Sequence, residues 1–153
     1  MATRYNEDFH AWTQDQAAKL RRLHATRSNV DLDLDHLAEE IESVGLSERR
    51  EVLSRMTVLV EHLLKLAYSA ATEPRAGWLR TVRVQRRDLA RLLEQSPSLA
   101  VFARENFEQC FVDGAEDART AHGDMEDAPI PATPPFTLAQ LLDRDWLPKA
   151  EGR

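Results

Sequence analysis

The sequence has a single cysteine, Cys110, and it lacks any long apolar run. One cysteine excludes an intrachain disulfide framework and any zinc site built from several cysteines. A membrane-spanning helix needs about 18 or more apolar residues in a row. The N-terminal residues MATRYNEDFH are polar and acidic, unlike a secretory signal. These absences predict a cytoplasmic protein with no membrane segment, in which Cys110 is buried rather than reactive.

The motifs of common enzyme classes are also missing. There is no glycine-rich phosphate loop, no HExxH zinc motif, no serine nucleophile elbow and no paired-cysteine motif. The formal net charge of -6 opposes nonspecific binding to the phosphates of nucleic acids. No cofactor is therefore predicted, and whether the protein is an enzyme stays open at this stage.

What is present is an ordinary globular composition. The chain has 153 residues, of which 42% are apolar and 30% are charged. This length is enough to bury a core without disulfides or metals, so the chain is expected to fold as one domain.

Four long segments carry the apolar spacing of amphipathic helices. They cover residues 5–27, 33–66, 78–95 and 100–121. Asn6 is the predicted cap of the first. The side chains expected to face the core outside the second segment are Phe9, Trp12, Leu20 and Leu23, then Trp78, Val82, Leu89, Leu92 and Leu93, and finally Val101, Phe102, Phe107, Phe111 and Val112.

The second segment contains Gly45, which could divide it. Its apolar residues before and after the glycine share one rotational phase, namely Leu34, Leu37, Ile41 and Val44, then Val52, Met56, Leu59, Leu63 and Leu66. A glycine inside a helix costs only about 1 kcal/mol relative to alanine. We therefore expect one long helix that continues through Gly45.

The C-terminal part has a different composition. Residues 121–136 are acidic and rich in proline, which predicts an extended linker with no helix of its own. Residues 137–153 are predicted to form a docking segment of the same domain, with Thr137 capping a short helix and Trp146 and Leu147 contacting the body. Residues 1–120 form the helical bundle domain in this interpretation.

These elements predict an all-α fold. No alternation of apolar and polar residues indicates a strand. Short loops between the four main helices favour antiparallel neighbours. We expect an antiparallel bundle of four main helices with a short C-terminal helical segment docked on it.

Five blocks of the sequence, taken together, resemble the bacterial family known as domain of unknown function 29. The blocks are YNEDFHAW, LAEEIESVGLSERR, EHLLKLAY, WLRTVRVQRRDLARLLEQSPSL and PFTLAQLLDRDWLP. They span nearly the whole chain in the expected order. Two positions depart from the family pattern, with Asn6 where an acid is usual and Gly77 where serine is more typical. The resemblance implies a helical bacterial protein and supplies no mechanism.

Three residues are candidates for catalysis in a hydrolase or nuclease, with or without a divalent metal: Asp8, Glu40 and His62. Histidine titrates near neutral pH, and a carboxylate can assist it in proton transfer. A continuous second helix would hold Glu40 and His62 about 33 Å apart, too far to share one ion. We favour a hydrogen-bonded structural role for His62 at the edge of the core.

Asp33, His36 and Glu40 share one face at the start of the second helix. A metal could bind such a cluster, but acids also favour a helix N-terminus without any function. We favour a solvated first turn, and no metal ligands are assigned.

The third helix carries a basic stripe formed by Arg80, Arg83, Arg87 and Arg91, to which Arg75 and Arg86 add charge. Arginines at this spacing could bind the phosphates of a nucleic acid. No aromatic residue is interleaved with them, as base stacking would require. We therefore favour pairing with acids of the second and fourth helices, and nucleic-acid binding is the alternative.

The leading functional prediction is a protein–protein interaction module that binds another protein or itself. Apolar surface left over on the long second helix would supply the contact, and at least some self-association is expected. The hydrolase and the nucleic-acid binder remain the two rival functions.

Overall fold

The computed structural model describes residues 4–27, 29–121 and 123–151. Its helices are α1 (Phe9–Ala25), α2 (Leu34–Tyr68), α3 (Arg75–Gln95), α4 (Leu99–Ala121) and the short α5 (Leu138–Leu142), with one turn of 3₁₀ helix, η1 (Gly123–Met125). None of the described residues forms a strand. The predicted all-α fold with four main helices and a short C-terminal helix is confirmed.

The central element is α2, a single helix of 35 residues. Gly45 lies inside it and is buried, so the prediction of a continuous helix is confirmed. The N-terminus of α2 is capped by Asp33, whose side chain accepts a hydrogen bond from the backbone nitrogen of His36. Such a cap satisfies one of the free amides of the first turn.

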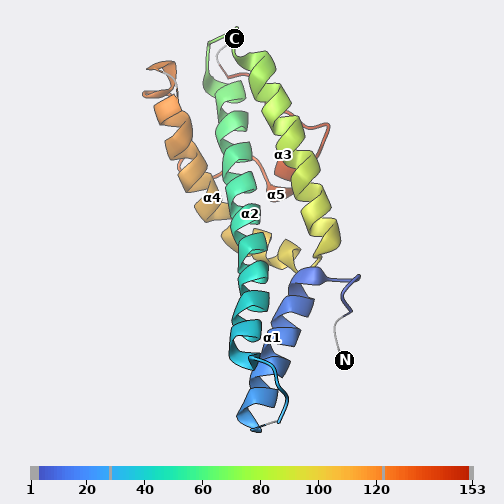
Figure 1. Cartoon of the computed structure of the whole chain (residues 1–153). Coiled ribbons are helices and arrows are strands. Elements are labelled where there is room, and N and C mark those ends of the chain that lie inside the picture. The colour runs from blue at the N-terminus through green and yellow to red at the C-terminus, as the bar shows by residue number, and fades with distance from the viewer. Residues whose placement is uncertain (1–3, 28, 122, 152–153) are drawn as a thin grey trace.

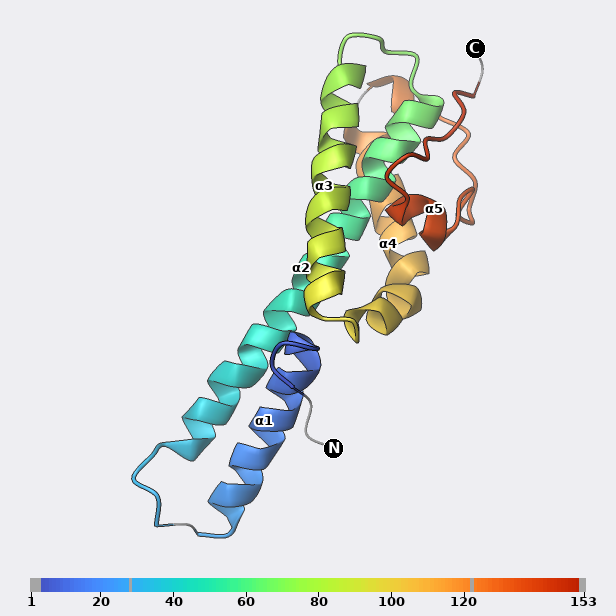
Figure 2. The same ribbon diagram turned by 90° about the vertical axis from the view of Figure 1, so that its right-hand side faces the viewer.

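The other helices divide along the length of α2 (Figures 1 and 2). Helix α1 runs antiparallel to the first half of α2, and we call α1 together with residues 34–50 the arm. Helices α3 and α4 lie against the second half, and we call them, with residues 51–68 and the C-terminal segment 123–151, the body. The four main helices therefore do not run side by side over one common length.

The body contains the hydrophobic core. Core residues from α2 include Val52, Met56, Leu59, Leu63 and Leu66, as predicted. Helices α3 and α4 contribute Trp78, Val82, Leu89, Leu92, Leu99, Ala103, Cys110 and Phe111. Cys110 is buried, and burial raises the pKa of its thiol, so it is a packed side chain as expected.

Several predicted core positions are wrong. Leu23, Leu37 and Val44 in the arm, and Val101 and Val112 on α4, are exposed. The prediction assumed that every apolar stripe faces a common core, whereas α1 and α2 form only a two-helix layer in the arm. A second correction concerns the first cap, which is Asp8 and not Asn6.

Helix α1 is buried on a different side from the one predicted. Its buried residues are His10, Thr13 and Ala17, while Phe9 and Trp12 are only partly buried. Small side chains allow the α1 backbone to approach α2 closely at Gly45 and Ala38. Larger residues at the contact would hold the two helix axes further apart.

The segment expected to be a helix-free linker packs onto the body. It contains η1, and its residues Met125, Ile130 and Phe136 belong to the core. Asp124 accepts hydrogen bonds from the Ser69 hydroxyl at 2.6 Å and from the Ala70 backbone nitrogen at 3.0 Å. The apolar residues, spaced five or six positions apart, anchor an otherwise extended chain.

The C-terminal helix docks as predicted. Thr137 caps α5 in a capping box with Gln140, and Leu141 is buried. Trp146 packs against the core, while Leu147 stays exposed.

Candidate functional site

The arm exposes an apolar surface that the fold leaves uncovered. Leu23, Leu37 and Val44 have exposed fractions of 39%, 40% and 46%. Leu20 and Ile41 are partly buried. We call these five residues, Leu20, Leu23, Leu37, Ile41 and Val44, the apolar face.

Helix geometry places the apolar face on one side of the arm. Successive residues turn by about 100° around a helix axis. Arg21 of α1 and Glu42 of α2 lie on one side of the buried α1–α2 contact, where they form an ion pair with a 2.7 Å N–O distance. Leu20 and Ile41, each one residue earlier, are turned to the other side. The ion pair and the apolar face thus occupy opposite edges of the arm.

Aromatic side chains extend this apolar surface near the N-terminus. The ring of Tyr5 meets those of Phe9 and Trp12 edge-on, with centroid distances of 5.3 and 4.9 Å. Tyr5 is exposed, and the other two side chains are only partly buried. Aromatic residues of this kind are enriched at protein interfaces.

The two helices of the arm carry opposite charge. The second half of α1 is basic, and the first half of α2 is acidic. The side chains of Arg22 on α1 and of Glu39 and Glu40 on α2 are exposed and make no hydrogen bond or ion pair with a described residue, although the Arg22 charge acts on Asp15 and the Glu39 charge acts on Arg21. The exposed charges of these two helix halves are therefore mainly of one sign on each.

A buried polar junction joins the arm to the body. Arg49 Nε donates a hydrogen bond to His10 Nε2 at 3.2 Å, and the Arg49 guanidinium lies 5.3 Å from the centre of the Phe102 ring. Because Nε2 accepts, the proton of the neutral imidazole is on Nδ1, which faces the Gly45 backbone and has no hydrogen bond of regular geometry. Burial, followed by the Arg49 charge, lowers the pKa of His10.

The same junction includes the connection between α3 and α4. The Ser96 hydroxyl donates to Glu48 Oε2 at 3.0 Å and accepts from the His10 backbone nitrogen at 3.0 Å. Asp8 accepts from the Ser98 backbone nitrogen at 2.6 Å and from the Ser98 hydroxyl at 2.9 Å. Burial raises the pKa of the Glu48 carboxyl, and the hydrogen bond from Ser96 acts in the opposite direction.

This junction fixes the position of the arm without forming a catalytic relay. The Ser96 hydroxyl proton goes to Glu48, and the imidazole of His10 receives its hydrogen bond from Arg49. A nucleophile needs a base that accepts its proton and a position open to substrate, yet Ser96 is completely buried.

The candidate catalytic residues do not converge. Asp8 caps α1 and binds Ser98, whereas Glu40 is exposed in the arm and His62 lies in the body. The continuous α2 keeps Glu40 and His62 about 33 Å apart, because the rise is 1.5 Å per residue.

His62 is hydrogen-bonded at the edge of the core, as the favoured interpretation requires. Its Nδ1 lies 2.9 Å from the Val58 carbonyl oxygen and therefore carries the proton. Burial lowers the pKa of His62, and the nearby Lys65 charge acts in the same direction.

The acidic–histidine cluster at the start of α2 is partly assembled. His36 Nδ1 lies 2.6 Å from Asp33 Oδ2, on the surface. The hydrogen bond from His36 lowers the pKa of Asp33, and the same contact raises the pKa of His36. Glu40 takes no part in this contact. In the ranges that the structure describes, no three histidine, cysteine, aspartate or glutamate side chains are placed to hold a metal ion.

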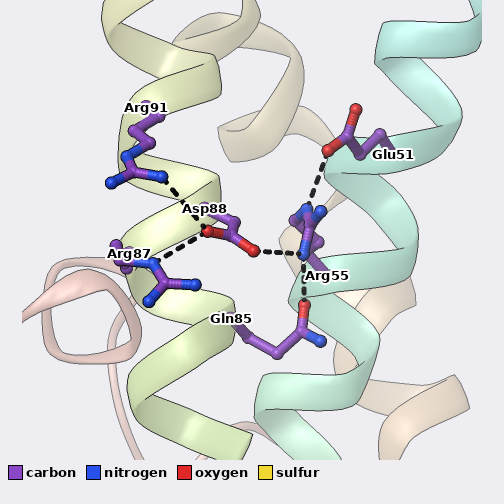
Figure 3. A network of polar contacts seen from close by, with 6 residues as sticks. All are labelled: Glu51, Arg55, Gln85, Arg87, Asp88 and Arg91. Atoms are coloured by element: carbon purple, nitrogen blue, oxygen red, sulfur yellow. Dashed lines mark hydrogen bonds and ion pairs between the residues drawn. The ribbon is translucent and has the colours of Figure 1, made fainter.

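The basic stripe of α3 is only partly neutralised (Figure 3). Arg87 and Arg91 contact Asp88 of the same helix at 3.0 and 4.0 Å. Arg55 of α2 also reaches Asp88 at 3.5 Å. Arg87 and Arg91 thus pair with an acid of their own helix and not with acids of α2 or α4. Asp88 is within reach because it lies one residue from Arg87 and three residues from Arg91.

Arg86 has a role that the sequence analysis missed. It is 3% exposed, and its guanidinium donates to the backbone carbonyls of Leu141, Trp146 and Gln140 at 2.8, 2.8 and 3.1 Å. Arg86 therefore ties the C-terminal segment to α3. A signal was available, since position 86 falls between Val82 and Leu89 on the apolar stripe of α3.

Comparison with known proteins finds one solved structure and one family model that match the chain. A crystal structure of an alpha-helical protein of unknown function from Rhodospirillum rubrum matches it with a TM-score of 0.79 and 26% sequence identity, covering 95% of this chain and 93% of that one. No curated protein matches the chain. Within the described residues, no helix combines the length and the apolar character that crossing a membrane requires. The model of the family called domain of unknown function DUF29 matches residues 4–147, and the chain belongs to this family.

Proposed function

We propose that this protein is a protein–protein interaction module whose arm associates with the arm of a second copy. The apolar face is the observation that carries the proposal. Two antiparallel helices alone cannot cover their apolar residues, and a second helical pair placed on that side completes a four-helix bundle. An isologous contact of this kind uses the same surface on both copies.

The charges of the arm favour a second copy as the partner. In a two-fold arrangement whose axis runs along the helices, α1 of one copy faces α2 of the other. Such packing sets the basic second half of α1 of one copy beside the acidic first half of α2 of the other. Opposite net charges on facing helices favour this pairing over one that sets α2 against α2.

The test is the molar mass in solution, measured by light scattering at low concentration and at the highest soluble concentration. The wild type is expected to form a dimer. The double variant Leu37→Glu/Val44→Glu is expected to be a monomer with unchanged helical content, because both side chains are exposed in one copy. Charges buried in the proposed contact would oppose association.

A control is Val112→Glu, which changes a valine on α4 that is 52% exposed, compared with 46% for Val44. This variant is expected to remain a dimer. A wild type that stays monomeric at the highest concentration contradicts the proposal, as does equal dissociation by Val112→Glu.

A further inference from the structure

A basic cleft lies in the body, apart from the arm. It has a volume of about 390 Å³ and is lined by Arg83, Arg86, Arg87, Arg144 and Asp145. One wall belongs to α3, and the other belongs to the chain that follows α5. The lining residues alone, four arginines and one aspartate, carry a formal charge of +3, and Asp88 beside the cleft pairs with Arg87.

The arginines of the cleft differ in how far they are already engaged. Arg83 and Arg144 are exposed and make no hydrogen bond or ion pair with any described residue. Arg87 uses its Nε to contact Asp88. Arg86 uses each of its three guanidinium nitrogens to hold a backbone carbonyl, so it fixes the wall and contributes its charge. Free guanidinium groups therefore remain on both walls, around a rigid buried arginine.

This arrangement fits a multivalent oxyanion. Guanidinium groups bind phosphate oxygens through paired, charge-assisted hydrogen bonds. The lining contains no aromatic ring on which a base could stack. The protein as a whole is negatively charged, which opposes a long phosphate chain running over its surface but not a small anion held inside the cleft.

We propose that the cleft between α3 and the 144–145 segment binds a small polyphosphate anion through Arg83, Arg87 and Arg144. The bound anion offsets the repulsion among the arginines and bridges α3 to the C-terminal segment. Binding to the folded state alone stabilises the protein by mass action.

Pyrophosphate is the probe that tests the site. The melting temperature of the full chain is measured with increasing pyrophosphate and, separately, with sodium chloride at the same ionic strength. The wild type is expected to show a saturable rise with pyrophosphate that sodium chloride does not reproduce. The double variant Arg83→Gln/Arg144→Gln is expected to bind pyrophosphate on the order of tenfold or more weakly, because it loses charge-assisted contacts from both walls.

The control is Arg104→Gln, which removes an exposed α4 arginine outside the cleft. It is expected to keep the wild-type response. Both variants should melt near the wild-type temperature without ligand, because the altered side chains make no hydrogen bond or ion pair in the described chain. The absence of any specific rise in the wild type overturns the proposal, and so does an equal loss in Arg104→Gln. Tighter binding of a single-stranded oligonucleotide than of pyrophosphate would replace it with nucleic-acid binding along the α3 stripe.

Discussion

Gly45 of α2 lies directly against Thr13 of α1, and a methyl group at position 45 would overlap the Thr13 hydroxyl oxygen. The glycine is therefore a contact point that lets the two helices of the arm approach each other, and α2 continues through it without a break. Its location inside a 35-residue helix does not mark a hinge.

The variant Gly45→Ala is expected to be less stable than the wild type by up to about 2 kcal/mol. Alanine gains about 1 kcal/mol in helix propensity, but overpacking a close contact costs about 1–3 kcal/mol. Urea unfolding measures the difference. In a Thr13→Ala background the overlap is gone, so Gly45→Ala should there be neutral or stabilising.

Gly77 provides a matched comparison within α3. A Cβ at this position meets nothing within 4 Å. Gly77→Ala is therefore expected to stabilise the protein by up to about 1 kcal/mol through helix propensity alone. Equal destabilisation by both alanine substitutions would show that the Thr13 contact does not set the requirement at position 45.

Asp8 is expected to link the arm to the body. Its carboxylate caps α1 through the Ala11 backbone nitrogen at 2.8 Å and also accepts from Ser98. Asp8→Ala should cost about 2 kcal/mol or more, since a lost cap costs about 1 kcal/mol and further hydrogen bonds are broken. Thr137→Ala, which removes a cap on the exposed side of α5, should cost less in the same unfolding experiment. A loss at Asp8 no larger than that at Thr137 would contradict the link.

Arg86 is expected to hold the C-terminal segment in place. Arg86→Lys should destabilise the protein by roughly 2–4 kcal/mol, because one ammonium group cannot serve three carbonyls arranged around a planar guanidinium. Hydrogen exchange of residues 138–147 should increase more than exchange in α1. Unchanged protection of this segment would mean that Leu141 and Trp146 hold it without the arginine.

His62 and His36 predict opposite effects of pH on stability. The pKa of His62 is lowered below the ordinary value of 6.5, so the unfolded chain takes up a proton first and stability falls as the pH drops below 6.5. Asp33 raises the pKa of His36 in the folded protein. The stability that this contact contributes is therefore present below pH 6.5 and is lost as the pH rises through the pKa of His36 in the folded state.

Thermal unfolding between pH 5 and pH 8 checks both signs. His62→Gln should show a shallower loss of stability on acidification than the wild type. His36→Gln should show a steeper one. Changes of the same sign in the two variants would contradict the assigned directions.

The sequence predicted the helices better than their contacts. The continuity of α2 followed from apolar residues in one phase on both sides of Gly45, a pattern that depends on the chain alone. The buried side of α1 could not be found in this way, because apolar spacing points to large side chains such as Trp12, whereas the closest contact uses Thr13 and Ala17.

The candidate sites show the same limit. The spacing of the arginines in the sequence predicted the stripe. Which of them are paired depends on the contact with Asp88 and on the position of the segment that follows α5, and the sequence did not predict either. Arg144 entered no prediction, since nothing in the sequence near it indicates that it lies opposite Arg83. Leu20 and Leu23 were expected to face the core, and leftover apolar surface was expected only on the second helix. The residues that stay exposed became evident once α3 and α4 were found beside the other half of α2.

The most direct test of the central claim measures the distance between two arms in solution. One nitroxide per chain is attached at Ser43, which is exposed on α2, by Ser43→Cys in a Cys110→Ala background. Neighbouring helix axes in a bundle lie about 8–10 Å apart, so pulsed dipolar spectroscopy should detect a distance of roughly 20–40 Å between copies, and Leu37→Glu/Val44→Glu should abolish it. No dipolar signal from the wild-type arm, or a signal that survives the two glutamates, would contradict association through the apolar face.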